Sequence, residues 1–117
     1  METQQCNRVR YHVNDIFWNR FCEMPWFLFS DEFKGISNDA RVLYSILRDR
    51  HELSLENQWL NENGEVYVLF SREEMCEILG VSENTVSRTM KVLKEKRLVE
   101  EDRQGLGKPN RIYLLKE

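Results

Sequence analysis

The clearest periodic pattern of hydrophobic and polar positions lies in residues 71–97, SREEMCEILGVSENTVSRTMKVLKEKR. Apolar residues recur at i, i+3 and i+4 in its first half, and at i, i+4 and i+7 in its second half. These spacings place the apolar side chains on one face of a helix. The two apolar stripes consist of Met75, Ile78 and Leu79, and of Val86, Met90 and Leu93. The pattern therefore predicts two amphipathic helices joined by a tight turn.

Polar residues at the expected positions mark the ends of both helices. Ser71, followed three residues later by Glu74, predicts a capping box at the start of the first helix. Gly80 predicts its end, because glycine enters the left-handed conformation without a steric penalty. Ser82 then predicts the N-cap of the second helix. The segment therefore has the form of a helix-turn-helix.

The outward face of the second helix is polar and basic. A helix-turn-helix places such a face in the major groove of DNA, where amides, hydroxyls and guanidinium groups bind base edges. The expected DNA contacts of this helix are Ser82, Asn84, Thr85, Ser87, Arg88 and Lys91. The expected contacts with the DNA backbone are Ser71, Arg72 and Lys94. The alternative at this point is two helices with a solvated polar face and no DNA contact.

The segments on either side of the helix pair predict further elements. Before it, Ser37 predicts the N-cap of a helix that runs to about Leu55, and residues 66–70, VYVLF, predict a strand that leads into Ser71. After it, residues 98–103 and 110–115 predict two strands. The loop between these strands contains two glycines and a proline, which is typical of a hairpin.

The resulting order is helix, strand, helix, helix, strand, strand. This order predicts an α+β fold of the winged helix-turn-helix type, with the C-terminal β-hairpin as the wing. Basic and amide side chains of the wing are expected to reach a neighbouring phosphate or the minor groove. They are Arg103, Lys108, Asn110 and Arg111.

The N-terminal part of the chain is rich in aromatic residues. We expect residues 1–24 to form an arm with a short strand around Tyr11 and Val13 and a dimer contact, and residues 25–117 to form the winged domain. Pro25 predicts the opening of a short helix at its first position. The aromatic side chains that follow are expected in the core or in a dimer interface: Trp26, Phe27 and Phe29.

Composition and charge narrow the choice of function. Hydrophobic residues make up 41% of the 117 residues and charged residues 32%, which is typical of a soluble single domain. The net charge is −3, but residues 82–117 hold nine Lys and Arg against six Asp and Glu, whereas residues 1–81 hold eight against 14. A basic C-terminal third on an acidic body favours local contact with phosphates.

Other classes of function lack support in the sequence. The three cysteines and two histidines show no metal-ligand spacing, and no nucleophile and base are paired. We therefore expect no catalytic residues, no metal and no other cofactor. The chain holds no apolar run long enough to span a bilayer and no signal peptide, so we expect a cytoplasmic protein.

Three segments resemble a known family. They are EMPWFLFSDEFKGISNDARVLYSILRDRHELS, WLNENGEVYVLFSREEMCEILGVSENTVSRTMKVLKEKRLVEE and RQGLGKPNRIYLLK, and together they cover about residues 23–116. The segments are similar to the N-terminal domain of the RepA-type (RepA_N) plasmid replication initiators of Gram-positive bacteria. The chain departs slightly from the family pattern at Gln58, before Trp59.

The resemblance implies a winged-helix domain that binds repeated sites in a plasmid origin and starts replication. It also implies a separate C-terminal region for contacts with host replication proteins. Repeated sites favour a homodimer, because paired domains read paired half-sites. A transcription regulator of the same fold is one alternative. A winged domain that binds proteins and not DNA is another, and its marker would be an apolar outer face on the second helix.

Overall fold

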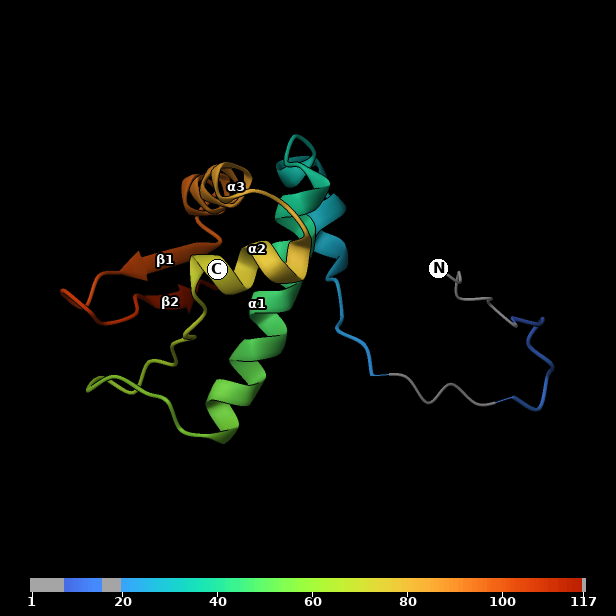
Figure 1. Cartoon of the computed structure of the whole chain (residues 1–117), viewed down its shortest axis with the longest axis horizontal. Coiled ribbons are helices and arrows are strands. Elements are labelled where there is room, and N and C mark those ends of the chain that lie inside the picture. Colours follow the sequence, from blue (N-terminus) through green and yellow to red (C-terminus); the bar gives the residue numbers. More distant parts are fainter. Residues whose placement is uncertain (1–7, 16–19, 117) are drawn as a thin grey trace, which may run out of the picture.

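A computed structural model describes residues 8–15 and 20–116 of the chain. In this part the chain forms three α-helices, two 3-10 turns and one antiparallel pair of strands (Figure 1). In chain order the elements are η1 (Trp26–Phe29), η2 (Asp31–Phe33), α1 (Asn38–Glu56), α2 (Arg72–Leu79), α3 (Glu83–Glu95), β1 (Val99–Asp102) and β2 (Arg111–Leu114). This order confirms the predicted α+β fold, a helix-turn-helix followed by a hairpin.

The three α-helices begin where the sequence predicts. The Ser37 hydroxyl accepts a hydrogen bond from the Ala40 backbone N–H at 3.1 Å, and α1 extends from there to Glu56. The Ser71 and Glu74 side chains form both hydrogen bonds of the capping box. Gly80 ends α2 with φ at 68°, in the left-handed region. Local side-chain chemistry therefore sets these boundaries.

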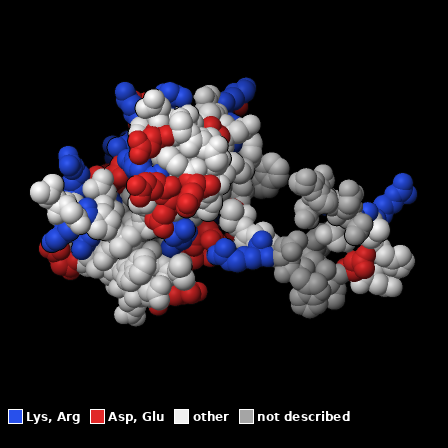
Figure 2. All heavy atoms as spheres, in the orientation of Figure 1, with Lys and Arg blue, Asp and Glu red and all other residues white. Residues whose placement is uncertain are grey.

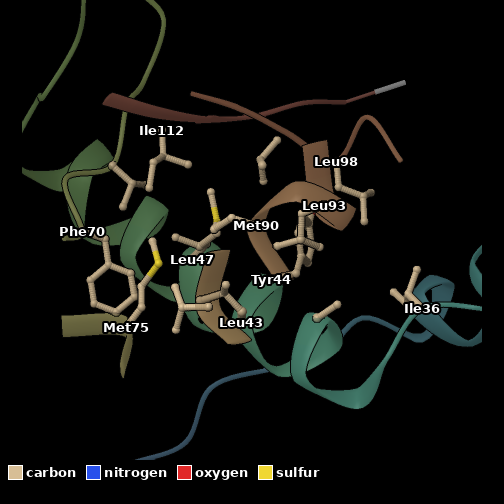
Figure 3. Packing of buried hydrophobic residues seen from close by; sticks show 14 of the residues in the cluster. Ile36, Leu43, Tyr44, Leu47, Phe70, Met75, Met90, Leu93, Leu98 and Ile112 are labelled. Carbon is tan, nitrogen blue, oxygen red and sulfur yellow. The ribbon is translucent and has the colours of Figure 1, made fainter. Parts of the chain in front are cut away.

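The core lies between α1, α3 and the wing strands (Figure 3). Leu43 and Leu47 of α1 meet Met90 of α3, and all three side chains are fully buried. Met75 of α2 and Ile112 of β2 close the cluster and are also fully buried. One prediction about these stripes is wrong. The side chain of Ile78 is 52% exposed, because only the Met75 side of this short helix contacts the core.

The segment before α1 differs from the prediction in detail. Pro25 precedes a 3-10 turn as its N-cap and is not the first residue of an α-helix. Leu28 is the buried residue of this turn, whereas Trp26 is 86% exposed. The Arg41 guanidinium fixes the turn to α1, since its Nε donates to the Leu28 carbonyl at 2.9 Å. The core therefore takes Leu28 in place of the tryptophan.

The strand predicted at residues 66–70 forms only isolated bridges. Val68 pairs with Ile112 of the wing, and Val66 pairs with Leu60 across a turn. The loop after α1 consequently lies on the same side as the wing (Figure 1), where the Asn61 amide donates to the Tyr113 hydroxyl at 3.3 Å. Only Val68 of the predicted strand pairs with the hairpin, so the sheet in the described residues has two strands.

The hairpin itself forms in the predicted place, with shorter strands. Val99 pairs with Leu114 and Asp102 with Arg111, in antiparallel register.

In the arm, the strand predicted around Tyr11 and Val13 is not formed in residues 8–15, which contain a turn at Val13 and Asn14. The rest of the arm, residues 1–7 and 16–19, lies outside the described residues, as does Glu117.

Candidate nucleic-acid interface

Helix α3 separates a buried apolar face from an exposed polar face. Val86, Met90 and Leu93 are fully buried against the core. On the opposite side the exposed residues predicted to meet DNA are Asn84, Ser87, Arg88 and Lys91. This exposed face holds amide, hydroxyl and cationic groups, the donors and acceptors that recognise base edges and phosphates.

The two other residues predicted on this helix, Ser82 and Thr85, are engaged with the helix itself. The Ser82 hydroxyl caps the helix by accepting from the Thr85 N–H at 3.2 Å, and it lies 3.1 Å from the Thr85 hydroxyl. Arg88 Nη2 donates to the same Thr85 hydroxyl at 3.4 Å. This short network holds Arg88 over the first turn of α3.

The N-terminus of α2 presents Ser71 at the surface. Its hydroxyl oxygen accepts from the Glu74 N–H at 3.0 Å, while the Glu74 carboxylate accepts from the Ser71 N–H, also at 3.0 Å. Because the hydroxyl acts here as an acceptor, its proton stays available for a phosphate oxygen. The structure thus gives Ser71 a structural role and leaves it exposed for a second role.

Three of the other predicted contacts converge on one carboxylate, that of Glu101 in β1. Arg72 Nη2 lies 2.8 Å and Lys94 Nζ 3.2 Å from Glu101 Oε1, and the Asn110 amide donates to Oε2 at 3.3 Å. The Glu101 side chain is only 6% exposed. The sequence placed Arg72 and Lys94 on the DNA backbone, whereas in the free protein both cations are paired with Glu101.

The surroundings of Glu101 favour its charged form. Burial by itself raises the pKa of this carboxyl group, but the hydrogen bond and the charge of Arg72 lower it, as do the hydrogen bonds from Asn110 and Lys94. The net result is a pKa below the ordinary value of 4.5. Glu101 is therefore an ionised anchor at the junction of α2, α3 and the wing.

The wing divides its basic residues into two kinds. Arg103 and Lys108 are exposed and have no ion pair within the described residues. Arg111 instead lies over the ring of Tyr67, with its guanidinium carbon 4.3 Å from the ring centroid, and is half-buried there. This stacking gives Arg111 a packing role between the loop after α1 and the wing.

Charge is unevenly distributed over the face that carries α2 and the wing. Figure 2 shows Lys and Arg atoms along the upper edge, near α3, and at the left edge, near the wing, with a group of carboxylates between them over α2. The first turn of α2 accounts for part of this acidic surface, with Glu73 and Glu74 exposed. An approaching polyanion is therefore attracted at α3 and the wing and repelled between them.

Glu101 is not among the residues predicted from the sequence, although the alternation along β1 contained a signal. Successive residues of a strand point to opposite faces, so Glu101 shares a face with Val99, two positions before it. Val99 is buried, and the side chain of Glu101 beside it is only 6% exposed. A carboxylate on the apolar face of a strand requires a cationic partner, and the nearby sequence offers several.

Neither a metal cluster nor a membrane-spanning helix occurs in the described part of the chain. Within residues 8–15 and 20–116, no three His, Cys, Asp or Glu side chains are grouped so that they could hold a metal ion. None of the helices found in the same residues is both long and apolar enough to cross a membrane.

Known proteins share both the sequence and the fold. The family model described as replication initiator protein A (RepA) N-terminus matches residues 20–117. A 41 kDa protein of Lactobacillus helveticus is 34% identical over 113 residues, which cover 91% of this chain and 32% of that protein. The chain therefore spans about a third of the length of this curated relative.

Solved structures agree with this relationship. One described as the N-terminal domain of a DNA binding protein has a TM-score of 0.74 and 35% identity, covering 93% of this chain and 84% of its own. A second, of a Rep-DNA complex, has a TM-score of 0.72 and 36% identity, covering 92% and 84%. A third, of an MDR initiator, has a TM-score of 0.72 and 30% identity, covering 92% and 86%. The chain belongs to the family of replication initiator protein A N-termini.

Proposed function

We propose that this chain binds double-stranded DNA sequence-specifically, at repeats in a plasmid origin, and that this binding starts plasmid replication. The observation that carries the proposal is the outward face of α3, where Asn84, Ser87, Arg88 and Lys91 are exposed opposite a fully buried apolar stripe. Membership of the initiator family and the likeness to a Rep-DNA complex support it. We assign the protein to the cytoplasm, where plasmid DNA resides.

In the proposed complex α3 enters the major groove. Asn84, Ser87 and Arg88 read base edges from the first turns of the helix, as recognition helices do. Ser82 and Thr85 contribute their hydroxyls at the same end, and Lys91 meets the major groove further along the helix. Ser71 donates its hydroxyl proton to a phosphate, and Arg72 and Lys94 reach the backbone to the extent that Glu101 releases them.

The wing provides the second set of proposed contacts. Lys108 and Arg103 are exposed on or beside its tip and carry unpaired charge within the described residues. Asn110 and Arg111 are half-buried where the loop of the hairpin enters β2. We propose that Lys108 and Arg103 contact a phosphate or the minor groove. We propose that Asn110 and Arg111 contact DNA through the parts of their side chains that remain exposed.

The test is fluorescence anisotropy with an origin fragment that bears the repeats and with scrambled DNA of equal length, at two salt concentrations. If Arg88 is bidentate to guanine, Arg88→Ala costs about 1–3 kcal/mol and relaxes specificity at one base pair. The charge-matched control for Arg88→Ala with Lys91→Ala is Lys34→Ala with Lys116→Ala, which removes two charges outside α2, α3 and the wing. Equal binding of repeats by both double variants would refute the assignment of α3.

A transcription regulator of this fold would contact DNA through the same residues, but at a promoter and not at origin repeats. Promoter DNA bound more tightly than origin repeats would favour that alternative. Binding to neither DNA, together with capture of a protein partner through α3, would favour the interaction domain. We propose that contacts with host replication proteins are made by regions outside the winged domain.

We also propose a homodimer, formed through an arm at residues 1–24 that joins the winged domain at residues 25–117. Apolar side chains in and next to the arm are left uncovered within one protomer, among them Val13, Phe21 and Trp26 at 90%, 76% and 86% exposure. Sedimentation equilibrium at micromolar protein tests this, with twice the chain mass of 14.2 kDa expected. A mass of about 14 kDa would refute the dimer.

A further inference from the structure

We propose that Glu101 is a positioning residue for DNA recognition, which fixes the wing against the helix-turn-helix and keeps two cations from binding DNA indiscriminately. The proposal rests on the proposed DNA binding and goes beyond it, because Glu101 is an anion that DNA itself would repel. Its role is therefore carried out through the residues that it holds.

The geometry shows how one carboxylate joins three elements. Arg72 reaches Glu101 from the start of α2, Lys94 from the last turn of α3, and Asn110 from the residue before β2. Both oxygens are used, Oε1 by the two cations and Oε2 by the amide. Since α3 and the wing are the two proposed groups of DNA contacts, Glu101 sets the distance between them.

The burial of Glu101 makes it costly to replace its three partners. With its side chain only 6% exposed, Glu101 cannot exchange its partners for water without a desolvation cost. Two of the three ion pairs within the described residues end on this carboxylate. The partners are less confined, since the Arg72 side chain is 32% and the Lys94 side chain 43% exposed. The junction is thus rigid at Glu101 and open to solvent at the cations.

The same arrangement divides the cations of the domain into two groups. Arg72 and Lys94 are both paired with the Glu101 carboxylate, whereas Arg88, Lys91, Arg103 and Lys108 have no ion pair within the described residues. Binding by the second group depends on the fit of α3 and the wing to one DNA site. If Glu101 lost its charge, the first group would add phosphate contacts that any sequence can provide.

The experiment uses the full chain with Glu101→Gln, which keeps the size of the side chain and removes its charge. The matched control is Glu100→Gln, which removes one charge from the adjacent, exposed position of the same strand. Affinity for repeat and scrambled DNA is measured as a function of salt. Glu101→Gln should steepen the salt slope for scrambled DNA by about one to two, at about 0.9 per freed cation, and reduce the specificity ratio several-fold.

Glu100→Gln should change affinity for both DNAs in parallel and leave the ratio intact. One outcome is that wild-type protein prefers repeat DNA to scrambled DNA, while Glu101→Gln and Glu100→Gln have the same affinities and salt slopes. This outcome would overturn the role of Glu101 and leave the proposed function standing. Wild-type protein that binds neither DNA would overturn the proposed function instead.

A second measurement needs no DNA. Amide hydrogen exchange at β1 and β2 should be faster in Glu101→Gln than in Glu100→Gln, because the wing loses its attachment to α2 and α3. Asn110→Ala removes one bond and no charge, so it should speed exchange and lower the specificity ratio without changing the salt slope. If amide exchange in Glu101→Gln and in Asn110→Ala were the same as in wild type, the positioning role would be overturned, even if either variant bound DNA differently.

Discussion

Val68 and Ile112 exchange both backbone hydrogen bonds, at 2.8 and 3.0 Å, and this pair ties the segment before α2 to the wing. Both side chains are almost completely buried, and Ile112 faces the core beside Met90 (Figure 3). Val68 and Ile112 are 44 residues apart in the sequence. Their side chains are buried in the core, and their backbones are paired, so both kinds of interaction hold these two segments together.

Ile112→Ala should lower the free energy of unfolding by about 2–5 kcal/mol, because it opens a cavity where β2 packs on the core. Urea denaturation measures the change. The control is Ile78→Ala, since Ile78 is about half exposed on α2 and its loss should cost much less. Equal losses in the two variants would contradict the assignment of Ile112 to the core.

Ser71→Ala should destabilise the protein by about 1 kcal/mol, because the Glu74 N–H loses its acceptor at the start of α2. Thermal or urea unfolding of the free protein measures the change. Ser87→Ala is the matched control: this serine is exposed in the interior of α3, where alanine is a good helix former. A loss of stability in Ser87→Ala as large as in Ser71→Ala would contradict the capping role.

The stability of the domain should fall in acid as Glu101 takes up a proton. The folded protein holds the pKa of Glu101 below the ordinary 4.5, so the unfolded chain binds this proton first. The contribution is present in full above pH 4.5 and is lost as the pH falls through the folded pKa. Urea unfolding at pH values from 7 to 3 should show a smaller acid loss in Glu101→Gln than in wild type, whereas Glu100→Gln should keep the wild-type loss.

Lys108→Ala should weaken binding to all DNA sequences by the same factor and reduce the salt slope by about one, if this lysine contacts a phosphate from the wing tip. Salt titrations by fluorescence anisotropy measure both quantities. Lys116→Ala removes the same charge from outside the wing and should leave the slope unchanged. A specific loss for the repeats alone would indicate base contact in place of phosphate contact.

The sequence by itself determined the helices and much of the proposed recognition face. Ser37, Ser71, Ser82 and Gly80 act on neighbours within four residues, so their capping roles can be read from spacing alone. The same is true of the outward face of α3, because a helix with Val86, Met90 and Leu93 buried must expose the residues between them. The hairpin followed from two short strands with a glycine-rich loop between them.

Only the tertiary structure decided which side chains meet across the chain. Local periodicity cannot tell that Leu28 is buried and Trp26 exposed, since the choice depends on how the 3-10 turn sits on α1. It cannot tell that Arg72 and Lys94 share one carboxylate, because the three residues come from separate elements. Energies of burial and of ion pairing depend on all the neighbours at once. For that reason the sequence predicted which helices and strands carry the cations, and the fold decided which cations are paired with a carboxylate.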